Sequence, residues 1–349
     1  MIKTNYYQDL TKMNTFGMKV KTRCFIEYES VADLVDIEVE ELARPVLHIG
    51  GGSNLLFTDD FKGTVLHSKI NFIEILDEQD SPCHSENQGE VAVSVGAGVI
   101  FDDFCAWAAK EGLWGIENLS YIPGEVGAAA VQNIGAYGVE VKDVIRKVYC
   151  YDTIEEEFVH FDVSDCRYGY RDSMFKATEI KGRYIVTHVV FALSRVPQPK
   201  LDYGHLRDAV EEQTPAMIRK AIIKIRKEKL PEPSVMGSAG SFFKNPVISL
   251  EHFHRIEAAA KTEHGADYNV PHYDLPESLV KVPAAWMIEQ CGWKGRRSGG
   301  AAVYDKQPLV IVNYTGEAYP EEIIGLERRI IASVKAKFDI ELHPEVEHI

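Results

Sequence analysis

Apolar residues recur along the chain with two different spacings, which predict two kinds of element. Short apolar runs bounded by glycine or by polar residues are typical of buried strands, and they lie at 45–49, 65–70, 73–76, 91–95, 144–151, 158–161 and 184–193. Apolar residues three and four positions apart are typical of helices, and they lie at 101–111, 216–229, 249–262, 284–291 and 320–338. Because strands and helices interleave with few clean β-α-β units, the pattern favours an α+β fold.

Prolines mark a candidate domain boundary. Pro197, Pro199 and Pro215 interrupt the strand pattern before the helix predicted at 216–229, and we place a boundary there. At 349 residues the chain is long enough for two or three domains, each with its own core. The apolar fraction of 45% is ordinary for a soluble globular protein.

Charge and cysteine usage exclude several classes of function. The net charge of −15 argues against a general nucleic-acid binder, which usually has a basic face. No apolar run reaches the roughly 18 residues of a membrane span, and the first residues lack the apolar core of a signal peptide. The cysteines are Cys24, Cys83, Cys105, Cys150, Cys166 and Cys291, without a Cys-x-x-Cys pair. We therefore expect reduced thiols in a cytoplasmic protein, with no metal and no membrane insertion.

A glycine loop directly follows the strand predicted at 45–49. Its residues are Gly50, Gly51, Gly52, Ser53 and Asn54. Glycines leave room for backbone amides to approach a phosphate, and the serine and asparagine side chains add donors. A tight turn between strands would also explain the loop. The dinucleotide-binding Gly-x-Gly-x-x-Gly pattern is not satisfied here.

A second segment of small residues lies at 122–138 and is predicted to be a loop. Small residues let the backbone crowd a flat ring, and Gln132 and Asn133 would offer amides to it. Tight packing of a helix on a sheet would explain the alanines, but it would leave the two amides unexplained.

The run at 237–246 reads Gly-Ser-Ala-Gly-Ser-Phe-Phe-Lys-Asn-Pro. Gly240 permits backbone conformations that would push Ser241 towards a ligand, and Lys244 and Asn245 could serve an anionic one. An ordinary strand and turn would also explain the run. Because Ser241 lacks a Gly-x-Ser-x-Gly context, a hydrolase nucleophile is not favoured.

The run at 166–176 packs charged and aromatic residues around one glycine. Arg171 lies within it beside Asp172, and such a pair is usually a surface ion pair.

In this order, the motifs at 45–56, 121–140, 166–176 and 237–246 resemble those of the flavin-dependent UDP-N-acetylenolpyruvoylglucosamine reductases, also called UDP-N-acetylmuramate dehydrogenases, of type I. The resemblance runs from Asn14 to Val346. It implies an FAD-binding domain of the p-cresol methylhydroxylase/vanillyl-alcohol-oxidase type in two subdomains, plus an α+β substrate-binding domain. The implied bounds are 1–66 and 67–213 for the subdomains and 214–334 for the UDP-sugar domain, with 335–349 returning near the active site.

The resemblance implies a non-covalent FAD site. Its residues would be Gly50, Gly51, Gly52, Ser53, Asn54, Pro123, Gly124, Gly127, Gln132, Asn133, Ile134 and Gly135. The implied reaction is the NADPH-dependent reduction of UDP-N-acetylglucosamine enolpyruvate to UDP-N-acetylmuramate in peptidoglycan precursor synthesis. FAD would supply the hydride chemistry.

Arg171, Ser241 and Glu345 match the catalytic residues of this family. The resemblance implies that hydride passes from flavin N5 to C3 and that Ser241 protonates C2. Arg171 would stabilise the charge that grows towards the carboxylate, and Glu345 would orient a donor or act as a neutral acid. The chain has Glu347 where the family often carries a basic residue, so the charge around Glu345 departs from the usual pattern.

The resemblance also implies substrate-binding residues, namely Tyr137, Tyr203, Lys229, Asn245 and Tyr273. Lys229 would pair with the pyrophosphate, and Tyr273 would lie on a loop at 265–274 that closes on it. We expect a monomer. Two alternatives remain open, a flavin-dependent alcohol oxidase on the same scaffold and a non-catalytic nucleotide-sugar binder.

Overall fold

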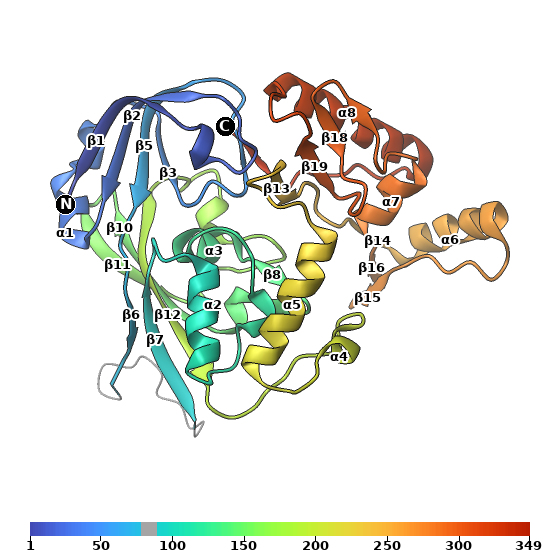
Figure 1. The fold of residues 1–349 in the computed structure, drawn as a ribbon, viewed down its shortest axis with the longest axis horizontal. Coiled ribbons are helices and arrows are strands. Elements are labelled where there is room, and N and C mark those ends of the chain that lie inside the picture. Colours follow the sequence, from blue (N-terminus) through green and yellow to red (C-terminus); the bar gives the residue numbers. More distant parts are fainter. Residues whose placement is uncertain (78–88) are drawn as a thin grey trace. The chain divides into compact units, whose positions relative to one another are not determined.

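The computed structural model describes residues 1–77 and 89–349, which form two compact units (Figure 1). Unit 1 consists of Met1–Leu10, Val20–Gly52 and Asp60–Glu228. Unit 2 consists of Thr11–Lys19, Ser53–Asp59 and Lys229–Ile349. Cys83 lies outside the described residues. The functional subdivision at 66, 213 and 334 stays a prediction.

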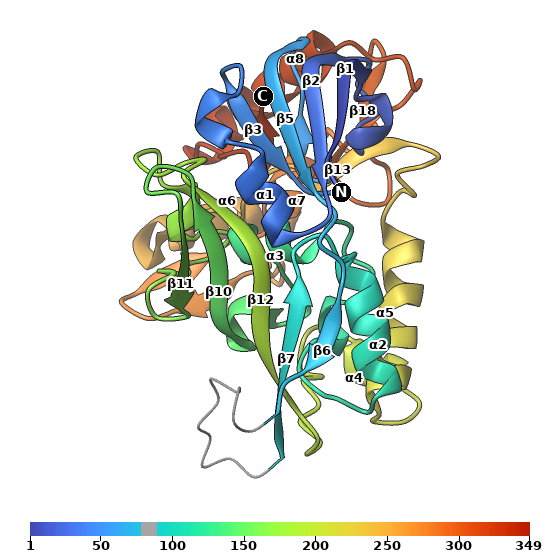
Figure 2. The same cartoon turned by 90° about the vertical axis from the view of Figure 1, so that its left-hand side faces the viewer.

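Unit 1 contains a mixed sheet of order β1–β2–β5–β3 (Figure 2). The strands are β1 (Lys3–Asp9), β2 (Lys21–Tyr28), β5 (Phe61–Ser68) and β3 (Val46–Ile49). β1 runs antiparallel to β2, whereas β2 and β3 both run parallel to β5. Helix α1 (Val31–Asp36) follows β2 and begins with a capping box between Ser30 and Asp33. The first glycine loop therefore starts at the end of a sheet strand.

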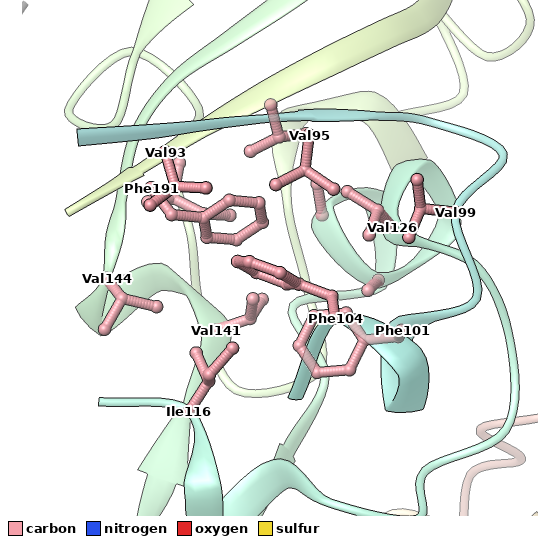
Figure 3. Close-up of a cluster of buried hydrophobic side chains, with 14 of the residues drawn as sticks. Val93, Val95, Val99, Phe101, Phe104, Ile116, Val126, Val141, Val144 and Phe191 are labelled. Carbon is pink, nitrogen blue, oxygen red and sulfur yellow. The ribbon is translucent and has the colours of Figure 1, made fainter. Parts of the chain in front are cut away.

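Unit 1 also contains an antiparallel sheet of order β11–β10–β12–β7–β6 (Figure 2). The strands are β11 (Glu157–Asp162), β10 (Ile145–Asp152), β12 (Tyr184–Ser194), β7 (Glu90–Gly96) and β6 (Ile73–Ile75). Helix α2 (Phe101–Lys110) contributes Phe101 and Phe104 to the core, together with Val93 and Phe191 (Figure 3). The Phe104 and Phe191 ring centroids are 4.8 Å apart. Each fully buried phenylalanine contributes about 1.5–3 kcal/mol, so this cluster firmly anchors the elements that follow β7.

Unit 1 contains further helices and two short strands. They are α3 (Val126–Gln132), β8 (Gly135–Ala136), β9 (Val139–Glu140), α4 (Leu206–Ala209) and α5 (Pro215–Lys229), whose last residue passes into unit 2. The prediction of a continuous loop at 122–138 is wrong, because 126–132 is helix α3. Alanine is the strongest helix former, and Gly127 lets this helix approach closely, since a Cβ there would lie 2.9 Å from the Ala97 Cβ.

Unit 2 contains an antiparallel sheet of order β13–β19–β18–β17. The strands are β13 (Gly237–Ser241), β19 (Val310–Asn313), β18 (Ala301–Val303) and β17 (Arg297–Ser298). Helix α8 (Pro320–Phe338) packs on β18 and β19, and α7 (Ala284–Gln290) packs on α8. This sheet positions β13, the strand that ends at Ser241.

The remaining elements of unit 2 form two smaller groups. The sheet β14–β16–β15 joins β14 (Val247–Ser249), β16 (Leu279–Lys281) and β15 (Tyr273–Leu275), and α6 (Leu250–His264) packs beside it. β20 (Glu347–His348) runs parallel to β4 (Leu55–Leu56). This pairing joins the last residues of the chain to the segment that follows the first glycine loop.

The predicted α+β class is confirmed, and the predicted strands and helices are present within a few residues of their expected bounds. Across residues 1–77 and 89–349, no helix has both the length and the apolar character that crossing a bilayer requires.

Candidate active site

The two glycine-rich segments meet inside unit 1. A Cβ on Gly50 would lie 3.0 Å from the Ala128 Cβ, and a Cβ on Gly51 would lie 3.4 Å from the Gly124 Cα. Gly52 has φ +62°, a left-handed conformation that favours glycine. The loop after β3 and the start of α3 therefore approach closely, Gly51 against the Gly124 backbone and Gly50 against the Ala128 and Glu125 side chains. Glycines at such a junction suit the close approach of phosphate to amide groups.

The Asn133 side chain makes several hydrogen bonds within and around the second glycine segment. It is fully buried and left-handed, with φ +44°. Its Nδ2 donates to the Glu140 Oε2 at 3.0 Å and to the Gly169 carbonyl at 2.7 Å, and its Oδ1 accepts from the Lys142 amide at 3.2 Å. The Asn133 side chain thus ties the end of α3 to the segment that carries Arg171.

Arg171 contacts the same segment directly. Its Nη2 donates to the Gly135 carbonyl at 2.5 Å, and its Nη1 donates to the Asn133 carbonyl at 3.5 Å. Lys176 Nζ donates to the Arg171 carbonyl at 3.1 Å and to the Gln132 Oε1 at 3.3 Å. The runs at 122–138 and 166–176, which the sequence identified separately, therefore lie together.

Several residues of this region have left-handed backbone conformations. Tyr121, Asn133, Tyr137 and Arg171 have φ of +61°, +44°, +49° and +55°. Non-glycine residues in this region cost about 1–3 kcal/mol each and cluster at functional sites. The second segment and Arg171 are thus held in a conformation that the surrounding packing must impose.

Two of the predicted substrate-binding tyrosines are neighbours in unit 1. The Tyr137 and Tyr203 rings meet edge to face with centroids 5.8 Å apart. Burial raises the pKa of the Tyr137 hydroxyl, while Arg226 opposes this. Arg226 also donates from Nε to the Tyr121 carbonyl at 3.1 Å. The sequence did not single out Arg226, because nothing in its local context distinguishes it from the other cations of α5.

In unit 2, the residues after Ser241 pair with the Glu345 segment. The Glu345 amide donates to the Phe242 carbonyl at 2.8 Å, and the Lys244 amide donates to the His343 carbonyl at 2.9 Å. Gly240 has φ +70°, and the pairing of β13 with β19 shifts register between Ser238 and Ser241. This bulge re-aims the strand at the serine, so two of the predicted catalytic residues lie on adjacent backbone segments.

Asn54 holds the Glu345 segment from its other side. Its Nδ2 donates to the Glu345 carbonyl at 3.1 Å, and its own carbonyl accepts from the Glu347 amide at 2.9 Å. The end of the predicted FAD loop and the predicted catalytic glutamate are therefore joined within unit 2.

The other predicted substrate-binding residues of unit 2 are spread over several elements. Asn245 accepts from the Ala284 amide at 2.9 Å, at the start of α7. Tyr273 is the exposed first residue of β15, with Lys281 Nζ 5.8 Å from its ring centroid. Lys229 is the exposed last residue of α5.

The predicted site residues are thus divided between the two units. Arg171 belongs to unit 1, whereas Ser241 and Glu345 belong to unit 2. The convergence of all three on one substrate stays a prediction, as do the individual roles of the predicted cofactor- and substrate-binding residues.

Family comparisons cover most of the chain. Residues 22–158 match the model described as FAD binding domain, and residues 232–349 match the one described as UDP-N-acetylenolpyruvoylglucosamine reductase, C-terminal domain. The UDP-N-acetylenolpyruvoylglucosamine reductase of Bacteroides fragilis is 48% identical over 344 residues, which cover 97% of this chain and 98% of the relative. The enzyme of the same name from Porphyromonas gingivalis is 44% identical over 347 residues, covering 97% of each chain.

The fold of the chain is similar to that of a solved structure. The crystal structure of UDP-N-acetylenolpyruvylglucosamine reductase (MurB) from Thermus caldophilus matches with a TM-score of 0.65 at 23% identity, over 100% of this chain and 98% of that one. The sequence identities to the curated relatives, over nearly their whole length, place the chain in a family. This chain belongs to the UDP-N-acetylenolpyruvoylglucosamine reductases.

Proposed function

We propose that this protein is an FAD-dependent oxidoreductase that reduces UDP-N-acetylglucosamine enolpyruvate to UDP-N-acetylmuramate, with NADPH as electron donor. The observation that carries the proposal is the 48% identity to a reductase of that name over 97% of the chain. The reaction would supply a precursor of the bacterial cell wall from a cytoplasmic enzyme acting as a monomer.

Most of the predicted FAD-binding residues belong to unit 1, and they fit FAD. Gly51 packs directly on the Gly124 backbone, and glycines at these positions leave room for backbone amides to approach a pyrophosphate. The residues that would hold FAD are Gly50 to Asn54 and Pro123, Gly124, Gly127 and Gln132 to Gly135. When bound, FAD would supply hydride chemistry, accepting a hydride from NADPH and giving one to C3 of the enolpyruvate.

Arg171 would bind the enolpyruvyl carboxylate. The carbonyls of Gly135 and Asn133 accept from its two terminal nitrogens and set the plane of the guanidinium. A fixed guanidinium needs little reorganisation when negative charge develops on the substrate, and this favours the transition state. Lysine could not reproduce the planar, forked geometry.

Ser241 would deliver the proton to C2. A serine hydroxyl is a weak acid, but the carbanion or enolate left by hydride addition is a strong base. The bulge at Gly240 aims the serine, and the Glu345 segment supports it through backbone hydrogen bonds to the residues after Ser241. Glu345 would orient the proton donor or hydrogen-bond the enolate.

The UDP moiety would be held by Tyr137, Tyr203, Lys229, Asn245 and Tyr273, with Lys229 on the pyrophosphate and closure of the loop at 265–274. The FAD subdomains would span 1–66 and 67–213 and the substrate domain 214–334, with 335–349 contributing Glu345. Such closure would exclude water from the reduced flavin.

The test separates the two half-reactions. Visible spectra of the purified protein are followed anaerobically through one addition of NADPH and then one of the enolpyruvate substrate. We expect the flavin bands to bleach and then to return. In Ser241→Ala, bleaching should be unchanged while recovery slows at least about 100-fold. Ser238→Ala, in the same strand, is the matched control.

A Ser241→Ala protein in which both half-reactions slow together would contradict the protonation role. Bands that bleach and never recover with the enolpyruvate would contradict the substrate. Rapid recovery in air without it would favour a flavin oxidase.

A further inference from the structure

The second glycine segment is fastened to the first turn of α2 at two consecutive residues. The Phe101 amide donates to the Gly124 carbonyl at 3.0 Å, and the Asp102 carboxylate accepts a hydrogen bond from the Tyr121 amide at its Oδ1. The φ of Tyr121 is +61°, a left-handed conformation that a tyrosine keeps only where its surroundings impose it. Helix α2 therefore sets the path of the chain from 121 to 124.

Arg219, in α5, fixes the Asp102 carboxylate in turn. Its Nη2 donates to the Asp102 Oδ2 at 2.9 Å, and its Nη1 donates to the Asp102 Oδ1. The Arg219 and Asp102 side chains are 16% and 23% exposed, so solvent screens this forked ion pair only partly. Because the guanidinium holds both oxygens, the carboxylate cannot turn away from the Tyr121 amide without breaking the pair.

The turn at 121–124 borders the first glycine loop. The Gly124 Cα lies 3.4 Å from the position of a Cβ on Gly51. At the other end of the turn, the Tyr121 carbonyl accepts from the Arg226 Nε at 3.1 Å. A shift of this turn would therefore change the junction of the two glycine segments.

We propose that Asp102 and Arg219 are positioning residues of the FAD site, an ion pair between α2 and α5 that fixes the turn at 121–124 and thereby sets the affinity for FAD. The proposal rests on the proposed function, since it assumes that Pro123 and Gly124 bind FAD. Without the pair, Tyr121 can leave its left-handed conformation. FAD must then select the competent conformation from several, and this raises the Kd.

The test compares two ion pairs of the same chemistry within unit 1. Asp152, at the end of β10, accepts from the Arg183 Nε at 2.9 Å and Nη2 at 2.6 Å, and it also accepts from the Ile154 amide at 3.0 Å. Asp102→Asn and Asp152→Asn should therefore lower the midpoint of urea unfolding by similar amounts. Asp102→Asn alone removes support from the turn at 121–124.

FAD binding to the apoprotein is measured by quenching of flavin fluorescence. We expect Asp102→Asn and Arg219→Gln to raise the Kd about tenfold, the scale of one lost charged hydrogen bond. Asp152→Asn should leave the Kd within about twofold of the unmodified protein. At saturating FAD, all three variants should be bleached by NADPH at the unmodified rate, because the pair acts on cofactor affinity rather than on the reaction.

Three outcomes would overturn the inference. The first is an Asp102→Asn or Arg219→Gln protein that binds FAD within about twofold of the unmodified protein. The second is an equal rise in Kd for Asp152→Asn, which would make the effect one of general stability. The third needs no variant, and it is hydrogen exchange at the Tyr121 amide of the unmodified apoprotein as fast as in an unfolded peptide. If the unmodified protein binds no FAD, it is the proposed function itself that fails.

Discussion

Replacing Asn133 with alanine should loosen the region around Arg171. Asn133 is completely buried, and its amide group makes hydrogen bonds to Glu140, Gly169 and Lys142. Alanine makes none of these, and it would have to keep the left-handed φ of +44° that asparagine tolerates better than most residues.

The magnitude follows from these contacts. Three lost hydrogen bonds cost about 1 kcal/mol each, and the groups left behind are partly buried. Holding alanine in the left-handed region adds about 1 kcal/mol. The Asn133→Ala change should therefore lower the free energy of unfolding by about 4 kcal/mol. Asn133→Gly loses the same hydrogen bonds without the backbone penalty, so it should cost about 1 kcal/mol less.

Two assays test this. Urea titration followed by circular dichroism gives the loss of stability. Hydrogen exchange of peptides covering 126–143 reports whether the opening is local. We also expect lower FAD content, because Arg171 and Gly135 share this packing. A loss below about 1 kcal/mol in Asn133→Ala, or an Asn133→Gly variant less stable than Asn133→Ala, would refute the reasoning.

The remaining predictions concern stability. A Cβ on Gly237 would lie 2.2 Å from the Phe16 carbonyl oxygen, so Gly237→Ala should lower the free energy of unfolding, measured by urea titration, by about 3 kcal/mol or more. Gly325 lies in open space within α8, so Gly325→Ala should raise the free energy of unfolding by about 0.5–1 kcal/mol. Equal effects of the two substitutions would contradict the steric argument. Burial opposes ionisation of Asp102, but hydrogen bonds from Arg219 hold the pKa of its carboxyl below its usual value. The resulting stabilisation is present above about pH 4 and lost as the pH falls further, so Asp102→Asn should be less stable at neutral pH and should lose less stability on acidification.

Local patterns predicted the longer helices and seven strands of unit 1, because periodicity and turn residues act over a few positions. They did not predict β2 or the short strands of the unit 2 sheets, and two further exceptions have physical reasons. β1 reads Lys-Thr-Asn-Tyr-Tyr-Gln-Asp and is largely exposed at a sheet edge, so it lacks the alternation that marks a half-buried strand. Helix α3 is made of small residues that fit a loop as well as a closely packed helix.

The candidate site was predictable where its residues are close in sequence. The motifs around Asn133, Arg171 and Ser241 combine unusual residue types within ten positions. Asp102 and Arg219 are separated by 117 positions and lie in unremarkable local contexts, so only the fold brings them together. The addition of 11–19 and 53–59 to unit 2 is likewise a tertiary effect that no local pattern encodes.

The three-segment construction of unit 2 has a consequence for biosynthesis. Ribosomes add about 5–20 residues per second, so segments 11–19 and 53–59 emerge on the order of ten seconds before their partners after residue 229. During that interval the Thr15 and Phe16 carbonyls lack their hydrogen-bond donors, which are the Ser238 amide and the Asn313 side chain. Unit 2 therefore cannot complete its fold until the residues after 229 have been synthesised. A fragment that begins at residue 232 would lack the Thr15 and Phe16 carbonyls, which accept hydrogen bonds from Ser238 and Asn313. It would also lack the Asn54 carbonyl, which accepts from the Glu347 amide.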